Sequence, residues 1–473
     1  MKKRMTPFLH PGRSDAALAC GLLGLALLGL PGCSSSLPYA PPALALPGKF
    51  KQAAPALAST APVTDAWWQV FADPVLNQLQ QDLLASNPTL QASLAQQQAA
   101  RAALGASQAA LSPSLGASLA TSRSLSAGGT PATTDALGFN AAWELDLWGR
   151  LSGSVDGALA RLQASQEDLA AVRLSLQGTL TQSYLALRTA DAQAELLQGT
   201  LQSYQRSLQL IQNRYAAGLA SSADVAQAQG QWRSTQAQLI EAGITRAQLE
   251  HALAVQTGRA PADFSLVKSS ALPAVPELPA LLPASLLQRR PDIAAAERRV
   301  AAAFAQEGVA RSAYFPSLTL SANAGYRGDS LANLVSAPNL LWSVGPALAA
   351  SVFDGGARRS AQEQAAAGSA QAVAAYRQTV LQALQEVEDN LLLAQRLAEE
   401  RVELSAALTA ARSALAVVGN QYQAGTLSYL NVLTAQNSAL AAQRSLLDVQ
   451  YRELLASAQL LKNVGATWRP EPR

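Results

Sequence analysis

The sequence predicts a mixed α/β protein that is internally duplicated, with long helices and two pairs of short strands. A repeated stretch gives the duplication, because its residues recur 207 positions later: Tyr215 as Tyr422, Gly218 as Gly425, Ser221 as Ser428, Val225 as Val432 and Gln229 as Gln436. Two further observations give the elements. Helical patterns twice change into alternation of apolar and polar residues, and one helical pattern runs unbroken from Arg150 to Ala217.

The composition favours long helices with small-residue seams over a thick globular core. Aromatic residues make up 5% of the 473 residues and charged residues 14%, while Ala, Gln, Leu and Ser are abundant. The net charge of +3 arises in the first fifteen residues, where four basic side chains face one acid. Because the remainder is close to neutral, we expect no nucleic-acid partner.

Residues 1–32 have the pattern of a secretion signal, with a basic start and an apolar run from Ala16 to Leu30. A run of about fifteen residues is too short to cross a bilayer as a helix. The ending Leu30-Pro31-Gly32-Cys33 resembles a bacterial lipoprotein signal, which implies that Cys33 carries lipid and becomes the first mature residue. Ser34 after it favours sorting to the outer membrane; the alternative is an ordinary secreted chain with an unmodified cysteine.

Few residues suited to metal binding or catalysis remain once this leader is removed. The mature chain keeps one cysteine, Cys33, and one histidine, His251, which excludes a disulfide and a Cys/His zinc site. His251 lies within a helical pattern, where an ordinary surface position is the simpler interpretation. We therefore expect no enzyme, no metal and no cofactor apart from covalent lipid on Cys33.

After the leader, residues 33–64 form a proline-rich segment that we expect to be an extended tether. A first repeat, 65–258, begins with the aromatic cluster Trp67-Trp68-Gln69-Val70-Phe71, interpreted as a core anchor. Its first long helical pattern starts at Pro88, capped by Asn87, and ends at Pro113. The same pattern of a helix bounded by two prolines, Pro291 and Pro316, opens a second repeat at 284–466. An irregular connector, 259–283, separates the repeats, and 467–473 is a C-terminal tail.

Each repeat carries a predicted β-hairpin, at 114–148 and at 317–353, with solvent-exposed loops at 122–135 and 327–338. Apolar residues fall at every second position, most clearly in Ser317–Tyr326, in Leu137–Leu147 and in Leu340–Val352. Strands of about ten residues with this period are typical of transmembrane β-strands. A soluble amphipathic sheet would use the same alternation, and Pro346 weakens its strand because it donates no N–H to the ladder.

A long helix follows each hairpin, after Gly149 in the first repeat and after Gly355-Gly356 in the second. From Arg150 to Ala217 such a helix measures roughly 100 Å, so it must lie in a coiled-coil-like bundle. Each helix ends in a tight tip, at 214–222 and 421–428, from which a return helix starts. Gly218 and Gly425 allow the left-handed conformation that ends a helix, and Ser222 and Ser428 are expected to cap the next one.

Four strands cannot close a transmembrane barrel, because a bilayer offers no water to an open edge and the smallest barrels have about eight strands. If the strands span a membrane, several identical chains must contribute to one barrel.

Six motifs in this order resemble the TolC-like outer-membrane efflux proteins, in particular the OprM-like lipoprotein branch. They are Trp67-Trp68-x-x-Phe71-x-Asp73-Pro74, Trp143-Glu144-Leu145-Asp146-Leu147-Trp148-Gly149-Arg150, Arg214-Tyr215-x-x-Gly218-Leu219, Arg289-Arg290-Pro291-Asp292-Ile293, Phe315-Pro316-Ser317-Leu318 and Phe353-Asp354-Gly355-Gly356. The resemblance implies a homotrimer with a twelve-stranded barrel in the outer membrane of a Gram-negative bacterium and a periplasmic α-helical tunnel. It also implies a periplasmic adaptor and an inner-membrane pump, of the RND type, as partners.

The same resemblance implies that the adaptor docks on the tips, at Arg214, Tyr215, Gly218, Leu219, Tyr422, Gly425 and Thr426. Many members carry aspartates after the second tip that narrow the closed tunnel; this chain has Asn431 and Thr434 there. A polar constriction of Tyr422, Asn431 and Thr434 is the corresponding expectation.

Three functions follow from these observations. The first is the exit duct of a tripartite efflux pump for drugs or other small toxic compounds. The alternatives are the outer-membrane channel of a type I protein secretion system and a periplasmic structural lipoprotein whose strands form a soluble sheet.

Overall fold

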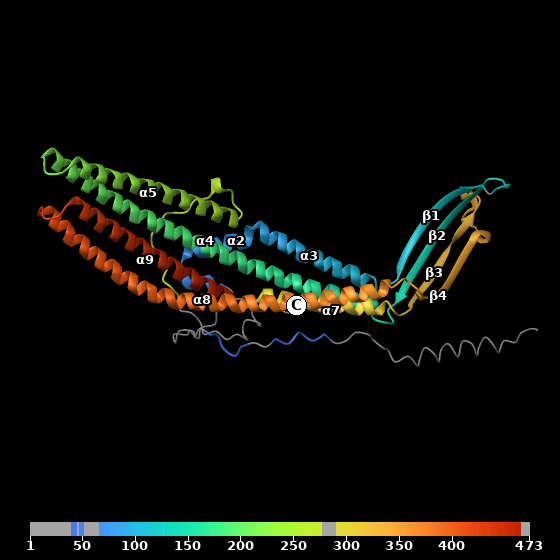
Figure 1. Ribbon diagram of the computed structural model, residues 1–473. Helices are drawn as coiled ribbons and strands as arrows, with labels where there is room; N and C mark the ends of the chain where they lie inside the picture. The colour runs from blue at the N-terminus through green and yellow to red at the C-terminus, as the bar shows by residue number, and fades with distance from the viewer. Residues whose placement is uncertain (1–38, 45–46, 52–65, 126, 277–289, 465–473) are drawn as a thin grey trace, which may run out of the picture. The chain divides into compact units, whose positions relative to one another are not determined.

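The computed structural model describes residues 39–44, 47–51, 66–125, 127–276 and 290–464 (Figure 1). The elements in chain order are η1 (Trp67–Phe71), α2 (Pro74–Ser86), α3 (Pro88–Ala109), β1 (Ser114–Ser124), β2 (Ala132–Leu145), α4 (Arg150–Ala216), α5 (Ser222–Gln256), η2 (Pro261–Asp263), α7 (Pro291–Ser312), β3 (Ser317–Gly328), η3 (Leu331–Asn333), η4 (Ala337–Asn339), β4 (Leu340–Ala349), α8 (Ala357–Gln423) and α9 (Tyr429–Val464). The predicted order of helices, hairpins and tips is confirmed.

The chain divides into two compact units. One holds the sheet and the helix ends next to it, with residues 101–125, 127–161 and 300–372. The other is helical and comprises, among the described residues, 42–44, 47–51, 66–100, 162–276, 290–299 and 373–464. The helices α3, α4, α7 and α8 each contribute residues to both units.

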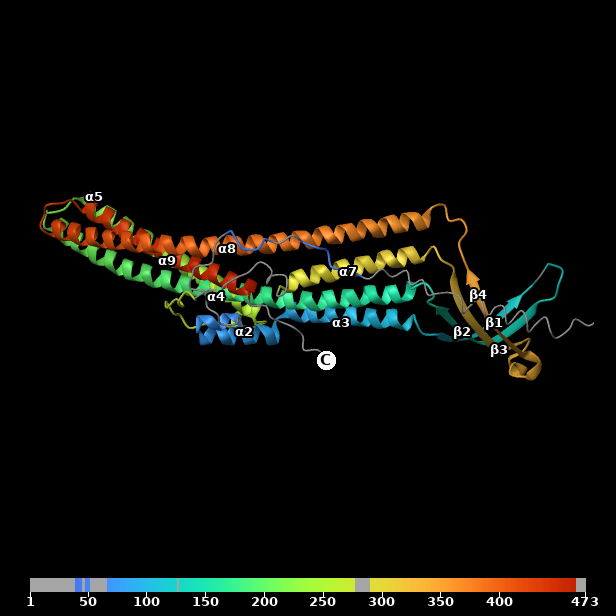
Figure 2. The ribbon, with the colours of Figure 1, turned by 90° about the horizontal axis from the view of Figure 1, so that it is seen from below.

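The sheet has four antiparallel strands in the order β1-β2-β3-β4, so the two predicted hairpins pair side by side through β2 and β3 (Figure 2). Three strand ends lie within the predicted loops: β1 extends to Ser124, β2 begins at Ala132 and β3 extends to Gly328. β4 begins at Leu340, just after the second predicted loop, and the β1–β2 register continues as far as Ser124 opposite Ala132. Hydrogen bonding across the ladder prolongs the strands here, although Gly, Ser and Thr favour turns. Pro346 lies in β4, at the edge of this chain's sheet, where proline is tolerated.

The two faces of the sheet differ in polarity. The register aligns Ala117, Phe139, Ala324 and Trp342 across all four strands on one face. This face is apolar along β2 from Leu137 to Leu145, roughly 26 Å at about 3.3 Å per residue. Beyond it, Thr121 Oγ1 donates to Asp135 Oδ1 at 2.8 Å.

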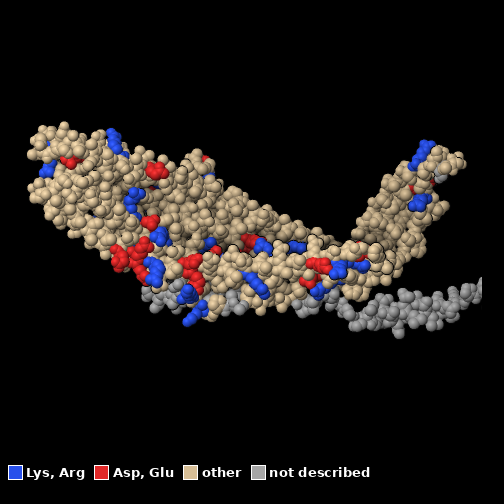
Figure 3. All heavy atoms as spheres, in the orientation of Figure 1, with Lys and Arg blue, Asp and Glu red and all other residues tan. Residues whose placement is uncertain are grey.

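The opposite face carries small, hydroxyl and amide side chains, among them Ser118, Asn140, Asn323 and Ser343. Many large apolar side chains of the first face are exposed in the single chain, including Leu115, Trp342 and Leu348. The visible surface of the sheet in Figure 3 has few charged side chains. A wide apolar face without a protein cover suits lipid contact.

An aspartate begins each long helix after its hairpin. Asp146 accepts hydrogen bonds from the amides of Leu151 (2.9 Å) and Ser152 (2.7 Å). Burial raises the pKa of the Asp146 carboxyl, but these bonds outweigh it and hold the pKa below its ordinary value. Asp354 likewise accepts from the amides of Gly356 and Arg358 at the start of α8. The acids therefore satisfy free N–H groups at the helix N-termini.

In the helical unit, the end of α5 meets the start of α3. Asn87 Nδ2 donates to Gln256 O at 2.8 Å, while Asn87 Oδ1 accepts from the amide of Leu90 and caps α3. Gly258 follows with φ of 71°, and a Cβ there would lie 2.3 Å from Ser86 O. Both the conformation and the close approach require glycine at this joint.

The predicted core anchor at the start of the first repeat is confirmed. Trp67, Trp68 and Phe71 are buried, with α2 side chains, against Tyr184, Leu187 and Leu454 of α4 and α9. The predicted unpacked tether is wrong at two described positions. Phe50 is 7% exposed and packs with Val387, Leu391 and Leu460, and the Tyr39 ring lies with its centroid 5.9 Å from that of Phe304. Burial of the Phe50 ring in its apolar recess removes its surface from water, and the free energy of that burial favours packing over an extended, solvated segment.

One helix of the described part of the chain, α8, contains a stretch long and apolar enough to cross a membrane by composition alone. Only 6% of that stretch is buried within the single chain. Irregular backbone with the short η2 follows α5 as far as residue 276.

Candidate functional site

The two tips have the same backbone geometry. In the first, the amide of Leu219 donates to Arg214 O at 2.7 Å and that of Gly218 to Tyr215 O at 2.9 Å. In the second, Thr426 donates to Gln421 O and Gly425 to Tyr422 O, both at 3.0 Å. The two glycines have φ of 74° and 78°. Each tip is therefore a Schellman ending, which only glycine adopts without strain.

The helix that leaves the first tip is capped by the serine at the repeat spacing. Ser221 caps α5 in a reciprocal capping box with Asp224. The predicted cap at Ser222 is wrong, because Ser222 is already the first residue of α5 and Asp224 stands at the position that completes a box with Ser221. In the second tip Asn431 occupies the place of Asp224, and its Nδ2 donates to Ser428 Oγ at 3.0 Å.

The tips share one hydrophobic cluster. Tyr422 and Tyr429 meet edge to face with ring centroids 5.9 Å apart, and Ile211, Ala228 and Val432 are buried with them. Burial raises the pKa of the Tyr429 hydroxyl to about 12, with smaller contributions from Tyr204, Tyr422 and Asp224.

Arg214 joins the first tip to the second. Its Nη1 and Nη2 donate to the carbonyl oxygens of Tyr422 and Gln423, both at 3.2 Å, and its guanidinium lies 4.6 Å from the centre of the Tyr422 ring. These carbonyls lie in the last turn of α8, where the helix itself supplies no donor, and that of Tyr422 also accepts the Gly425 amide of the tip. Arg214 is thus half-buried between the tips, and its charge faces backbone dipoles.

The remaining predicted docking residues lie at the surface. Leu219 is 76% exposed and Tyr215 52%, and Gly218, Gly425 and Thr426 are exposed as well. Tyr422 is the exception, because only 9% of it is exposed although it occupies the repeat position of Tyr215. The structure therefore brings together an apolar, exposed first tip and a second tip whose tyrosine is internal.

The residues expected at a constriction are each held by a local contact. Tyr422 belongs to the tip cluster, Asn431 bonds to Ser428, and Thr434 Oγ1 donates to Leu430 O at 2.9 Å. Within the described ranges, no hydrogen bond joins any two of the three. Asn431 and Thr434 are exposed.

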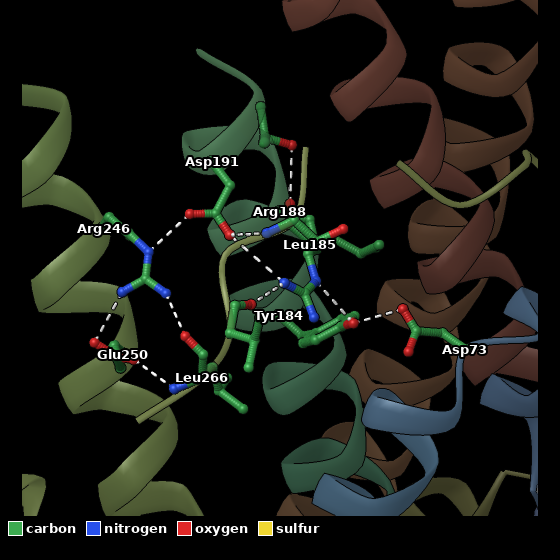
Figure 4. A network of polar contacts seen from close by, with 11 residues as sticks. Asp73, Tyr184, Leu185, Arg188, Asp191, Arg246, Glu250 and Leu266 are labelled. Atoms are coloured by element: carbon green, nitrogen blue, oxygen red, sulfur yellow. Dashed lines mark hydrogen bonds and ion pairs between the residues drawn. The ribbon is translucent and has the colours of Figure 1, made fainter. Parts of the chain in front are cut away.

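A buried polar network, not anticipated from the sequence, holds the connector to the first repeat (Figure 4). Asp191 accepts from Arg246 Nε at 2.7 Å, and Arg188 lies 3.5 Å from its other oxygen. Arg246 also pairs with Glu250 at 2.9 Å. These side chains are at most 15% exposed, and removing one partner from such a group typically costs about 3–5 kcal/mol.

The network binds backbone of the connector directly. Arg246 Nη2 donates to Leu266 O at 2.7 Å, and the Leu266 amide returns a bond to Glu250 at 2.6 Å. Arg188 donates to Val267 O at 2.9 Å and to Tyr184, whose hydroxyl in turn bonds to Asp73. In the sequence, the signal for this network is the pair of spacings of three and four between opposite charges within Ala- and Gln-rich helices, Arg188 to Asp191 and Arg246 to Glu250.

Other predicted positions are simple to place. His251 is exposed on α5. Cys33 lies outside the described residues.

An amphipathic four-stranded sheet with both edges unpaired within the described chain, joined to helices of 67 residues, defines a membrane duct built from several copies. A profile of the family "Outer membrane efflux protein" matches residues 79–259 and 282–466. The chain belongs to this family.

Relatives and solved structures agree with this membership. The chain is 30% identical to the cation efflux system protein CusC of Escherichia coli O6:H1, over 95% of this chain and 99% of CusC. It is 32% identical to the pyoverdine export outer membrane protein OpmQ of Pseudomonas aeruginosa, over 96% of each. The outer-membrane channel OprN superposes with a TM-score of 0.86 at 29% identity, covering 93% of this chain and 100% of OprN.

The chain is therefore an efflux channel of the outer membrane, the exit duct of a tripartite pump. Its four strands form one third of a twelve-stranded trimeric barrel, and its long helices form a tunnel in the periplasm. A periplasmic adaptor and an inner-membrane pump complete the assembly.

Proposed function

We propose that this duct exports drugs or other small toxic compounds for an RND-type pump, and that its two tips dock the periplasmic adaptor. It acts passively, without catalysis, and its covalent group is lipid on Cys33 after removal of the signal, 1–32. The tether, 33–64, then leads into two efflux repeats, 65–258 and 284–466, separated by the connector, 259–283, and followed by the tail, 467–473.

Similarity to several relatives supports a duct that does not itself select the cargo. Relatives named for cation efflux, pyoverdine export and toluene efflux match this chain at 30%, 32% and 33% identity. Ducts for such different cargoes thus resemble this chain equally. The polar sheet face, which carries mainly small, hydroxyl and amide side chains, also favours a lumen with little chemical preference.

Exposure of the first tip is the observation that carries the docking proposal. Leu219 and Tyr215 present apolar surface beside a rigid turn, while Arg214 fixes this tip to the second one. Nothing in a plain helical hairpin requires a side chain as apolar as Leu219 to be 76% exposed at its end. A partner surface that covers Leu219 accounts for it.

The docking test compares Leu219→Asp with Val267→Asp, the same kind of apolar-to-acidic change at an exposed side chain of the connector. Leu219→Asp is expected to abolish drug export and adaptor co-purification while the trimer reaches the membrane in normal amounts, because the changed side chain touches no core residue. Val267, 87% exposed, is expected to tolerate the change. Normal adaptor binding by the Leu219→Asp trimer contradicts the proposal.

We also propose that Tyr422, Asn431 and Thr434 form the narrow, uncharged end of the tunnel. The support is position: Asn431 replaces the acid found at the same place in the first tip, Asp224. Asn431→Asp is nearly isosteric and adds one negative charge per copy. We expect the reversal potential of single channels in a salt gradient to shift toward cation preference. An unchanged reversal potential places the constriction elsewhere.

A further inference from the structure

The junction between β4 and α8 exposes two large apolar side chains. Val352 is 96% exposed and Phe353 89%, although both lie in the short segment between a strand and a helix. Asp354 next to them is held by the start of α8, so the segment has a defined path. An exposed phenylalanine on ordered backbone calls for a partner.

The corresponding junction inside the chain is covered. Between β2 and α4, the Trp148 ring stacks on Phe315, which precedes β3, with centroids 5.0 Å apart and planes at 19°. Trp148 Nε1 also donates to Pro316 O at 2.6 Å. This contact closes the seam where the end of β2 lies next to the start of β3.

The duplication creates the same seam once more, between copies. The end of β4 and the start of β1 lie at the helix end of the sheet, and they are its two open edges. Closure of the barrel by three copies brings β4 of one copy against β1 of the next. The inference rests on this closure, which follows from the family and not from the tip proposal.

Both stacking rings are missing at the second seam. At the repeat spacing of 207, Gly355 stands in the place of Trp148. Ser112 precedes Pro113, as Phe315 precedes Pro316. A seam of the same geometry built with Gly355 and Ser112 leaves room for other side chains. Leu111 lies beside it, 38% exposed, with its carbonyl held by Trp143 Nε1 at 2.9 Å.

We propose that Phe353 of each copy, with Val352, packs on Leu111 of the next copy and replaces the Trp148–Phe315 stack as the closure of the seam between subunits. The apolar side chains belong to the two segments that flank the open edges. Their counterpart inside the chain is a direct contact between the same two kinds of segment. Lipid contact of Phe353 is the competing outcome.

Cross-linking in membranes tests the proposal. The double variant Phe353→Cys/Leu111→Cys, treated with a short bifunctional maleimide, is expected to give covalent dimers and trimers on a denaturing gel. The control double variant Phe353→Cys/Val335→Cys, whose second site lies on the outer loop at the opposite end of the strands, is expected to remain monomeric. Each single variant measures any background from Cys33.

Absence of cross-links in a normal trimer, together with labelling of Phe353→Cys by a lipid-soluble maleimide, overturns the proposal in favour of lipid. A wild-type chain that is monomeric in mild detergent overturns the closure on which it rests. As a second measurement, Phe353→Ser is expected to lower the temperature at which the trimer dissociates in detergent. Leu331→Ser, a change of another exposed apolar residue on the outer loop, is expected to leave that temperature unchanged.

Discussion

At the scale of single residues, the duplication shows how one pattern serves two roles. Tyr215 and Tyr422 occupy equivalent places before equivalent glycines, yet one is 52% exposed and the other 9%. Tyr422 packs in the tip cluster and Arg214 lies over its ring, whereas the residue equivalent to Arg214 in the second repeat is Gln421. Because only the first repeat carries an arginine at this position, this link runs from the first tip to the second.

Tyr429 gives the tip cluster a predictable response to alkaline pH. Burial raises its pKa from 10.0 to about 12, so the folded state favours the protonated hydroxyl. Its contribution to stability is complete below pH 10 and is lost as the pH rises through about 12. In detergent, the thermal transition of the wild-type protein is expected to fall more between pH 9 and 12 than that of Tyr429→Phe. Equal falls contradict this prediction, since Tyr204 and Tyr451 titrate in both proteins.

At the scale of elements, side-chain alternation and strand register together define what each face of the sheet contacts. The register places Phe139 between Ala117 and Ala324 on the apolar face, whereas Asn140 lies between Gly116 and Asn323 on the polar one. Adjacent residues of one strand therefore meet opposite environments. Matched substitutions at these two positions isolate the effect of the membrane.

Phe139→Arg places a charge on the lipid face near the middle of the strand and is expected to cost about 2–4 kcal/mol. Asn140→Arg, one residue away on the lumen face, is expected to cost far less. Leu320→Arg and Thr319→Arg form a second pair of the same kind on β3. The yield of heat-sensitive trimer in isolated outer membranes measures the cost, and equal yields for both faces contradict a lipid-facing sheet.

At the scale of the whole molecule, the single chain is incomplete. Both edges of its sheet carry unpaired N–H and C=O groups within the described residues, and much apolar surface of the strands and of α8 is exposed. In a bilayer such edges are not tolerated. Trimer formation is therefore a condition of membrane insertion and not a later association.

The lipid on Cys33 is expected to help hold the protein in the outer membrane, with the barrel as a second anchor. Cys33→Ser should abolish labelling with a fatty-acid probe, while the barrel keeps the trimer in the outer membrane and part of the drug export remains. Fractionation, labelling and drug susceptibility measure the three effects. Persistent labelling of Cys33→Ser excludes the lipid assignment, and complete loss of the trimer from the membrane shows that the barrel alone does not hold it.

The sequence by itself determined the elements, because periodicity, proline and glycine act locally. Pro88 and Pro291 start helices where expected, Gly218 and Gly425 end them, and alternation separates the faces of all four strands. The motifs also indicated the family. Each of these signals depends on neighbours within a few residues, which are visible in the chain itself.

Only the tertiary structure decided which of these residues meet. Arg214 reaches carbonyl groups more than two hundred positions away, and Asp191 reaches Arg246 and the connector. The burial of Tyr422 and of Phe50 likewise depends on helices that are distant in the chain. Such contacts depend on how long helices align side by side, and a local pattern of residue types does not encode that alignment.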